Sequence, residues 1–259
     1  MTCRDVDHLI IALVSGRAVP SAVAAHIADC AHCSGLVRAL RDARTPAGQL
    51  QSLDVATLPD IKAVKPIARA SVRWIALVGF VALVAAAGMT LLGAAGWHAL
   101  SLLQASAVFT TLAGAAALLA TSLSRQIVPG SRIFVTPWLL AATGPALMAA
   151  IFLALFQPHH EPTFVLTGLV CLRIGLECAI AAGLLFWLAL RRGTMFNPVS
   201  TGATAGALAG LAGLTVLEIF CPNLNQHHVL VWHLGSAITS TLAGLAIGII
   251  VELRCDSRP

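Results

Sequence analysis

Six long apolar stretches are the feature that most limits the fold of this chain. They lie at about residues 74–96, 100–123, 133–156, 164–190, 198–220 and 229–251. Each stretch is long enough to cross the hydrocarbon core of a membrane as a helix, which takes about 20 residues. The sequence therefore predicts an all-α protein with a six-helix transmembrane bundle over residues 73–252.

The composition agrees with a membrane protein. Of the 259 residues, 58% are hydrophobic and only 10% are charged, and the mean hydropathy is +0.87. Soluble domains carry about 25% charged residues. The net charge of +5 then reports orientation in the membrane and not a surface for nucleic acid. We expect no direct nucleic-acid partner.

The basic residues lie on one side of the predicted bundle. The loops at 95–100, 157–163 and 221–228 contain no Lys or Arg, whereas fifteen of the sixteen basic residues lie in the other loops and the terminal regions. The positive-inside rule then places both termini in the cytoplasm. The short apolar run at 9–14 follows acidic and not basic residues, so it does not resemble a signal peptide.

A second feature lies near the N-terminus, where His26, Cys30 and Cys33 follow the spacing H-x3-C-x2-C. Two thiolates and one imidazole at these spacings are typical zinc ligands, and Cys3 can complete a tetrahedral site. A head of about 45 residues cannot bury a sufficient core, so a zinc ion would stabilise it. Four protein ligands leave no open position for a substrate, which argues against an enzyme. The alternative is a set of reduced structural cysteines.

These features divide the chain into four parts. Residues 1–45 are expected to form the zinc-binding head, built of two or three short helices, and residues 46–72 a linker with three prolines. The bundle follows over 73–252, and 253–259 form a cytoplasmic tail.

Two resemblances cover different parts of the chain. Cys3 with the segment His26–Cys33 resembles the zinc-binding anti-sigma domain. Residues 60–252 resemble the NrsF family, which are negative regulators of an extracytoplasmic-function sigma factor. The second resemblance rests on the segment Asp60–Trp74, Cys171 in the fourth stretch, Arg191–Gly193 after it, the Gly/Ala-rich fifth stretch, and Cys221-Pro222 ahead of Trp232-His233.

The NrsF resemblance implies a six-span protein of the bacterial inner membrane whose cytoplasmic N-terminus holds the sigma factor. It also implies an association with metal and oxidant stress. Here the usual N-terminus is replaced or extended by the zinc head, so either the head or the linker could make the main contact with the sigma factor. In the head, an apolar stripe at helical spacing would pack in the core or contact the partner; it consists of Val6, Leu9, Ile10, Leu13 and Val14.

Two groups of polar residues belong to the predicted bundle. Arg173 and Glu177 lie four residues apart near the middle of the membrane, which predicts an intrahelical ion pair. Its role would be structural, or it would serve signal coupling or proton movement. The predicted outer side gathers soft donors: His98, His159, His160, Glu161, Cys221, His227 and His228, with Glu218 and His233 just inside. These histidines could simply replace Lys and Arg in outer loops.

The alternative for the outer donors is a sensor of metal or oxidant. The NrsF resemblance implies cysteines at positions 171 and 221 that are coupled to metal stress. An oxidant could join Cys171 and Cys221, or a soft metal could bridge them with His227 or His228.

Glycines at four-residue spacing occur in the last two apolar stretches. Gly202, Gly206 and Gly210 lie in the fifth stretch, and Gly244 and Gly248 in the sixth. Such spacing lets helices approach closely, so these glycines either pack the bundle or join two copies in a homodimer.

The sequence as a whole predicts a membrane-bound anti-sigma factor that is not an enzyme. It would sequester an extracytoplasmic-function sigma factor and release it on an outer-face signal. The alternative is a small metal or proton transporter with a regulatory zinc head. A transporter would need polar groups at mid-depth in several spans, whereas Arg173 and Glu177 lie on one.

Overall fold

The computed structural model describes Cys3, Val6, Leu9 and residues 18–42, 70–127, 136–190 and 197–256. The predicted linker 46–72 lies almost wholly outside these residues, as do Ile10, Leu13 and Val14. The chain divides into two compact units, Met1–Lys65 and Pro66–Pro259.

Among residues 18–42, the first unit has two short helices, α2 (Ser21–Asp29) and α3 (Ala31–Asp42). Pro20 precedes α2, as suits a residue that has no N–H to donate. Cys30 separates the two helices, and Cys33 lies in the first turn of α3. The turn expected between the two cysteines is therefore placed at Cys30 itself. A small core holds this unit together, formed by Val6, Val23, Ile27, Cys33 and Val37.

The second unit is an all-helical bundle, which confirms the predicted fold class. Its long helices are α4 (Ala70–Leu92), α6 (Leu102–Gln126), α7 (Pro137–Leu155), α8 (Phe164–Leu190), α9 (Pro198–Phe220) and α11 (Leu234–Asp256). Three short elements complete it: α5 (Ala95–Ala99), α10 (Gln226–His228) and the π-helical turn η3 (Val229–His233). With α10 and η3 joined to α11, the described part of the chain has six helical segments that are long and apolar enough to cross a membrane.

Local signals explain where the helices begin and end. α4 ends four residues before the predicted boundary because Gly93 adopts a positive φ of 94°, and its N–H donates to Met89 O. Glycine favours this left-handed conformation at a helix C-terminus. α6 begins with a capping box in which the Ser101 and Gln104 side chains each accept from the other's backbone N–H.

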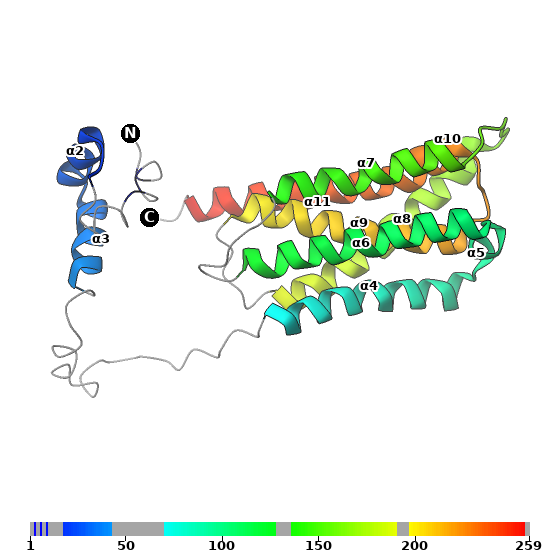
Figure 1. Ribbon diagram of the computed structural model, residues 1–259, viewed down its shortest axis with the longest axis horizontal. Coiled ribbons are helices and arrows are strands. Elements are labelled where there is room, and N and C mark those ends of the chain that lie inside the picture. Colours follow the sequence, from blue (N-terminus) through cyan, green and yellow to red (C-terminus); the bar gives the residue numbers. More distant parts are fainter. Residues whose placement is uncertain are drawn as a thin grey trace. The chain divides into compact units, whose positions relative to one another are not determined.

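The connections after α4, α7 and α9 meet at one end of the bundle. The N–H of Gln226 donates to Gln157 O, and the Asn225 side chain donates to His159 O. α5 packs against the end of α9. The N-terminus of α4 and the C-terminus of α11 lie together at the opposite end (Figure 1). The loops that lack basic residues therefore share one end of the bundle, here called the outer end.

α9 is the central helix of the bundle. In its apolar segment 78% of the residues are buried, against 17–28% in the other five. Its longest contact is with α11, where glycines of both helices let the backbones touch. Gly202, Gly206 and Gly210 face the stretch of α11 that includes Gly244 and Gly248. The glycine stripe is thus used inside the chain, and a homodimer would have to use another surface.

A side chain at the α9–α11 contact should destabilise the bundle. A Cβ on Gly206 would press on Ser240 O and come within 3.0 Å of Gly244 Cα, which are backbone atoms that cannot rotate away. We expect Gly206→Ala to lower the free energy of unfolding by about 1–3 kcal/mol, as overpacking does. Thermal unfolding of the purified protein in detergent measures this. Gly79→Ala is the matched control, because a Cβ there meets nothing within 4 Å; equal effects of both variants would contradict the packing.

Candidate metal centres

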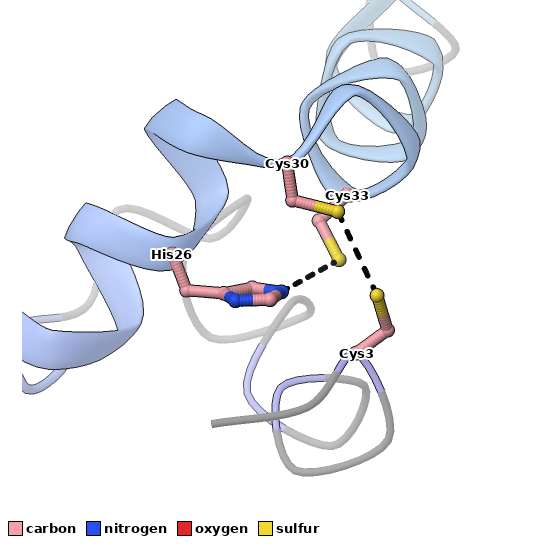
Figure 2. Close-up of side chains that lie close together, drawn as sticks. All are labelled: Cys3, His26, Cys30 and Cys33. Carbon is pink, nitrogen blue, oxygen red and sulfur yellow. Dashed lines mark hydrogen bonds between the residues drawn. The ribbon is translucent and has the colours of Figure 1, made fainter.

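The first candidate centre lies in the head. His26 comes from α2, Cys30 from the junction of α2 and α3, Cys33 from the first turn of α3, and Cys3 from the N-terminal segment (Figure 2). Cys3 Sγ lies 3.6 Å from Cys30 Sγ, and Cys33 Sγ lies 3.6 Å from His26 Nε2. All four ligand atoms lie within 4.8 Å of one another. The four residues named from the sequence are therefore brought together.

The distances between these atoms fit one tetrahedral ion. Zinc–sulfur bonds of about 2.3 Å place the corners of a tetrahedron about 3.8 Å apart. The observed separations of 3.6 Å are close to this edge. Three thiols and one imidazole also match the donor preference of structural zinc. The head thus contains a possible zinc site with a closed coordination shell.

The head thiols differ in acidity. Burial, together with the neighbouring thiols Cys3 and Cys30, raises the pKa of Cys33 to about 12. The backbone N–H of Cys33 and the thiol of Cys3 lower the pKa of Cys30. A metal ion binds thiolates, so zinc binding here would release protons.

Part of the predicted apolar stripe belongs to the core of the head. Val6 is fully buried, and Leu9 packs against the same cluster. Both side chains therefore support the head internally; Val6 has no surface left for a partner, whereas Leu9 is only partly buried.

The second candidate centre lies at the outer end of the bundle. Cys171 of α8 and Cys221 at the end of α9 are buried, with their sulfurs 3.5 Å apart. His228 Nε2 lies 3.7 Å from Cys221 Sγ. Cys171, Cys221, His228 and His233 each offer a ligand atom within 4.8 Å of the others.

A carboxylate lies near the Nδ1 atom of each of the two histidines. His233 Nδ1 is 2.8 Å from Glu218 Oε1, and both side chains are almost fully buried. His228 Nδ1 is 3.5 Å from Glu161 Oε2. Burial raises the pKa of Glu161, but hydrogen bonds from Thr167 and Asn223 outweigh this and hold it below its ordinary value. Glu161 is therefore placed as an anion beside the cluster.

The outer cluster differs from the predicted set in one histidine. His227 is exposed and lines a surface pocket with His159 and His160, whereas His233 takes the fourth place in the cluster. The sequence did place His233 just inside the membrane but gave no reason to select it. Its position depends on the π-helical turn η3, which hydropathy does not reveal.

Arg173 and Glu177 belong to neither cluster. Arg173 Nε is 2.7 Å from Glu177 Oε1 along one face of α8. Their side chains are 78% and 58% exposed on the outside of the bundle. The pair therefore faces outward and does not line the interior.

The six-helix bundle matches a known protein family. The family model named NrsF, described as negative regulator of sigma F, matches residues 59–252. The chain belongs to this family. The match covers the bundle from α4 to residue 252, within the last turns of α11, while the head cluster precedes it. No curated protein and no solved structure gives a significant match.

Membership in NrsF gives the protein a role in transcription. The family consists of negative regulators of a sigma factor, which is not a class of enzymes. The six long apolar helices are compatible with a multi-pass membrane protein.

Proposed function

We propose that this protein is an anti-sigma factor of the inner membrane that sequesters an extracytoplasmic-function sigma factor. The NrsF match over the six-helix body carries this proposal. In the proposed arrangement both termini are cytoplasmic, so the head and the linker meet the sigma factor. A signal at the outer end then releases it.

The head is suited to hold a protein partner. Its possible zinc site fastens α2, α3 and the N-terminal segment together, although the described apolar core has only five buried residues. A metal-fastened scaffold of this kind presents rigid helix faces at small size. Zinc would then be structural, and the sigma factor would contact the outer faces of the two helices.

The outer cluster is suited to receive a signal. Cys171 and Cys221 belong to different helices, and Cys221 adjoins the central helix α9. A metal ion or an oxidant that acts on both thiols would change how α8 and α9 pack. Because α9 contacts every other spanning helix, such a change could reach the cytoplasmic end of the bundle.

Co-purification tests the sigma-factor proposal. Full-length zinc-loaded protein in detergent should retain a sigma factor of the extracytoplasmic-function type from its own host. Residues 1–72 should retain the same sigma factor without the bundle. Failure of the full-length protein with every sigma factor of the host would instead favour the metal or proton transporter.

Reporter fusions test the orientation. The one-sided distribution of Lys and Arg predicts that fusions at Gly130 and Gly193 report a cytoplasmic location and that a fusion at His160 reports the outer side. A reversed signal at any of the three positions would refute the proposed topology.

A further inference from the structure

We propose that the outer cluster is a complete tetrahedral metal site with Cys171, Cys221, His228 and His233 as ligands and with Glu218 and Glu161 as supporting carboxylates. The occupant is a divalent d10 cation of the zinc and cadmium type. The proposal deepens the proposed function, and only its regulatory consequence rests on that function. Metal binding itself is tested on the purified protein.

The geometry carries the ligand set. The Cys171–Cys221 and Cys221–His228 separations of 3.5 and 3.7 Å are close to the tetrahedron edge of about 3.8 Å expected for zinc thiolates. His233 Nδ1 forms a hydrogen bond with Glu218 Oε1. Nε2 of the same ring is buried without a hydrogen-bond partner among the described residues. A buried imidazole nitrogen left in this way is costly, and a metal ion would satisfy it.

The π-helical turn explains how two histidines of one segment reach one ion. Residues five apart in an α-helix point about 140° away from each other. In η3 the N–H of Leu234 bonds to Val229 O, five residues back, so the turn is wider. The His228 and His233 rings then lie 5.2 Å apart. Such π turns are rare and occur often at functional sites.

A carboxylate lies beside each histidine, as is typical of a metal ligand; Glu218 is hydrogen-bonded to His233, whereas Glu161 lies within ion-pair distance of His228 without a hydrogen bond. A metal-bound imidazole usually donates its other N–H to a carboxylate, which fixes the ring and raises its basicity. Glu218 meets His233 in this way at 2.8 Å, and Glu161 approaches His228 at 3.5 Å. Two thiolates with two supported imidazoles favour a divalent ion. Two thiols alone would suit Cu⁺.

The site also joins three spanning segments. Cys171 belongs to α8, Cys221 follows α9, and the histidines lie at the head of the last segment. Gly96 of α5 adds a fourth contact, because a Cβ there would lie 2.6 Å from Cys221 O and 2.7 Å from Glu218 O. Metal binding would therefore draw α8 toward the end of α9 and the start of the last segment.

Cadmium binding to full-length protein in detergent tests the site. The protein should carry Cys30→Ser and Cys33→Ser, so that the head does not contribute. We expect one Cd²⁺ per chain and a thiolate-to-cadmium absorption band in the ultraviolet. Glu218→Gln should weaken the affinity about 10–100-fold, and His233→Gln should weaken it at least as much. His227→Gln is the matched control and should leave the affinity unchanged.

Two results would overturn the site. One is the absence of Cd²⁺ binding in the protein with the intact outer cluster. The other is binding that disappears in Cys171→Ser but is unaffected in both His233→Gln and Glu218→Gln, because this would show a thiol pair without histidine ligands. The sigma-factor test uses the protein with its head unchanged. If that protein retains no sigma factor while the Cys30→Ser, Cys33→Ser variant binds Cd²⁺ as expected, the proposed function is refuted and the metal site stands.

A different observation supports a second inference, that α8 pairs with α8 of a second copy of the chain. By helical rise Arg173 lies about 14 Å from the outer end of α8, near the middle of a membrane. The exposed Arg173–Glu177 pair would then face lipid tails, where charged groups are costly and are usually covered. A second copy in the same membrane brings the same pair to the same depth.

The charges and the surrounding side chains suit a parallel pair of helices. Across a two-fold axis, Arg173 of each copy can reach Glu177 of the other, which gives a neutral group of four charges. The exposed residues on this face alternate in steps of four and three, which is the repeat of a left-handed coiled coil; they are Leu166, Val170, Arg173, Glu177, Ile180 and Leu184.

A charge exchange tests this pairing in lipid nanodiscs or native membranes. The unchanged chain should be dimeric, and Arg173→Glu should make it monomeric because like charges then meet. The exchange Arg173→Glu with Glu177→Arg should restore the dimer. Ile250→Ala, on the exposed face of α11, is the control and should remain dimeric. A monomeric unchanged chain, or a dimer that Arg173→Glu leaves intact, would overturn the pairing.

Discussion

A chain that carries Cys30→Ser and Cys33→Ser is expected to lose one equivalent of zinc and to stop repressing its sigma factor. The reason is the small size of the head, whose described core has five buried residues, one of them Cys33 itself. Apparent binding energies of structural zinc reach about 10–16 kcal/mol in zinc-finger peptides, and that energy is folding energy. The target genes should then be transcribed without any signal.

Metal content of the purified protein and a transcriptional reporter in cells measure the two effects. Cys178→Ser is the matched control, because this half-buried thiol of α8 belongs to neither cluster. It should keep both zinc and repression. An unchanged zinc content in the double variant would refute the head site. Lost zinc with full repression would place the sigma-factor contact in the linker.

Cys171→Ser and Cys221→Ser should each abolish induction by a metal or oxidant signal while basal repression remains. The two sulfurs are buried 3.5 Å apart, one in α8 and one at the end of α9. Removal of either one leaves a single thiol, which a metal or an oxidant cannot use to link the two helices. The head is unchanged in these variants and should still hold the sigma factor.

The same transcriptional reporter, challenged with metal or with oxidant, measures this effect. Cys178→Ser should respond as the unchanged chain does. A fully retained response in the Cys171→Ser, Cys221→Ser double variant would remove these residues from the mechanism. A response lost to metal but kept to oxidant would separate the two signals.

The sequence was sufficient for features that depend on local pattern. Helices that cross a membrane must be continuously apolar for about 20 residues, so hydropathy alone located all six. The head ligands His26, Cys30 and Cys33 lie within eight residues, and their spacing brought them together whatever the rest of the chain does. Boundaries shifted by a few residues where a single glycine, Gly93, ends α4 early.

The tertiary structure alone decided which distant residues meet and which faces are covered. Mean hydropathy ranges from 1.6 to 2.5 among the six spans and is lowest in α9, so it could not reveal that α9 is central or that its glycines pack on α11. The order of the spans placed many outer donors on one side, but the π turn brings His233, and not the exposed His227, into the cluster. The helical spacing of Arg173 and Glu177 predicted their pairing, whereas only packing around α9 turned that pair outward. Long-range packing depends on side-chain shape across several helices at once, and no single stretch of sequence contains that information.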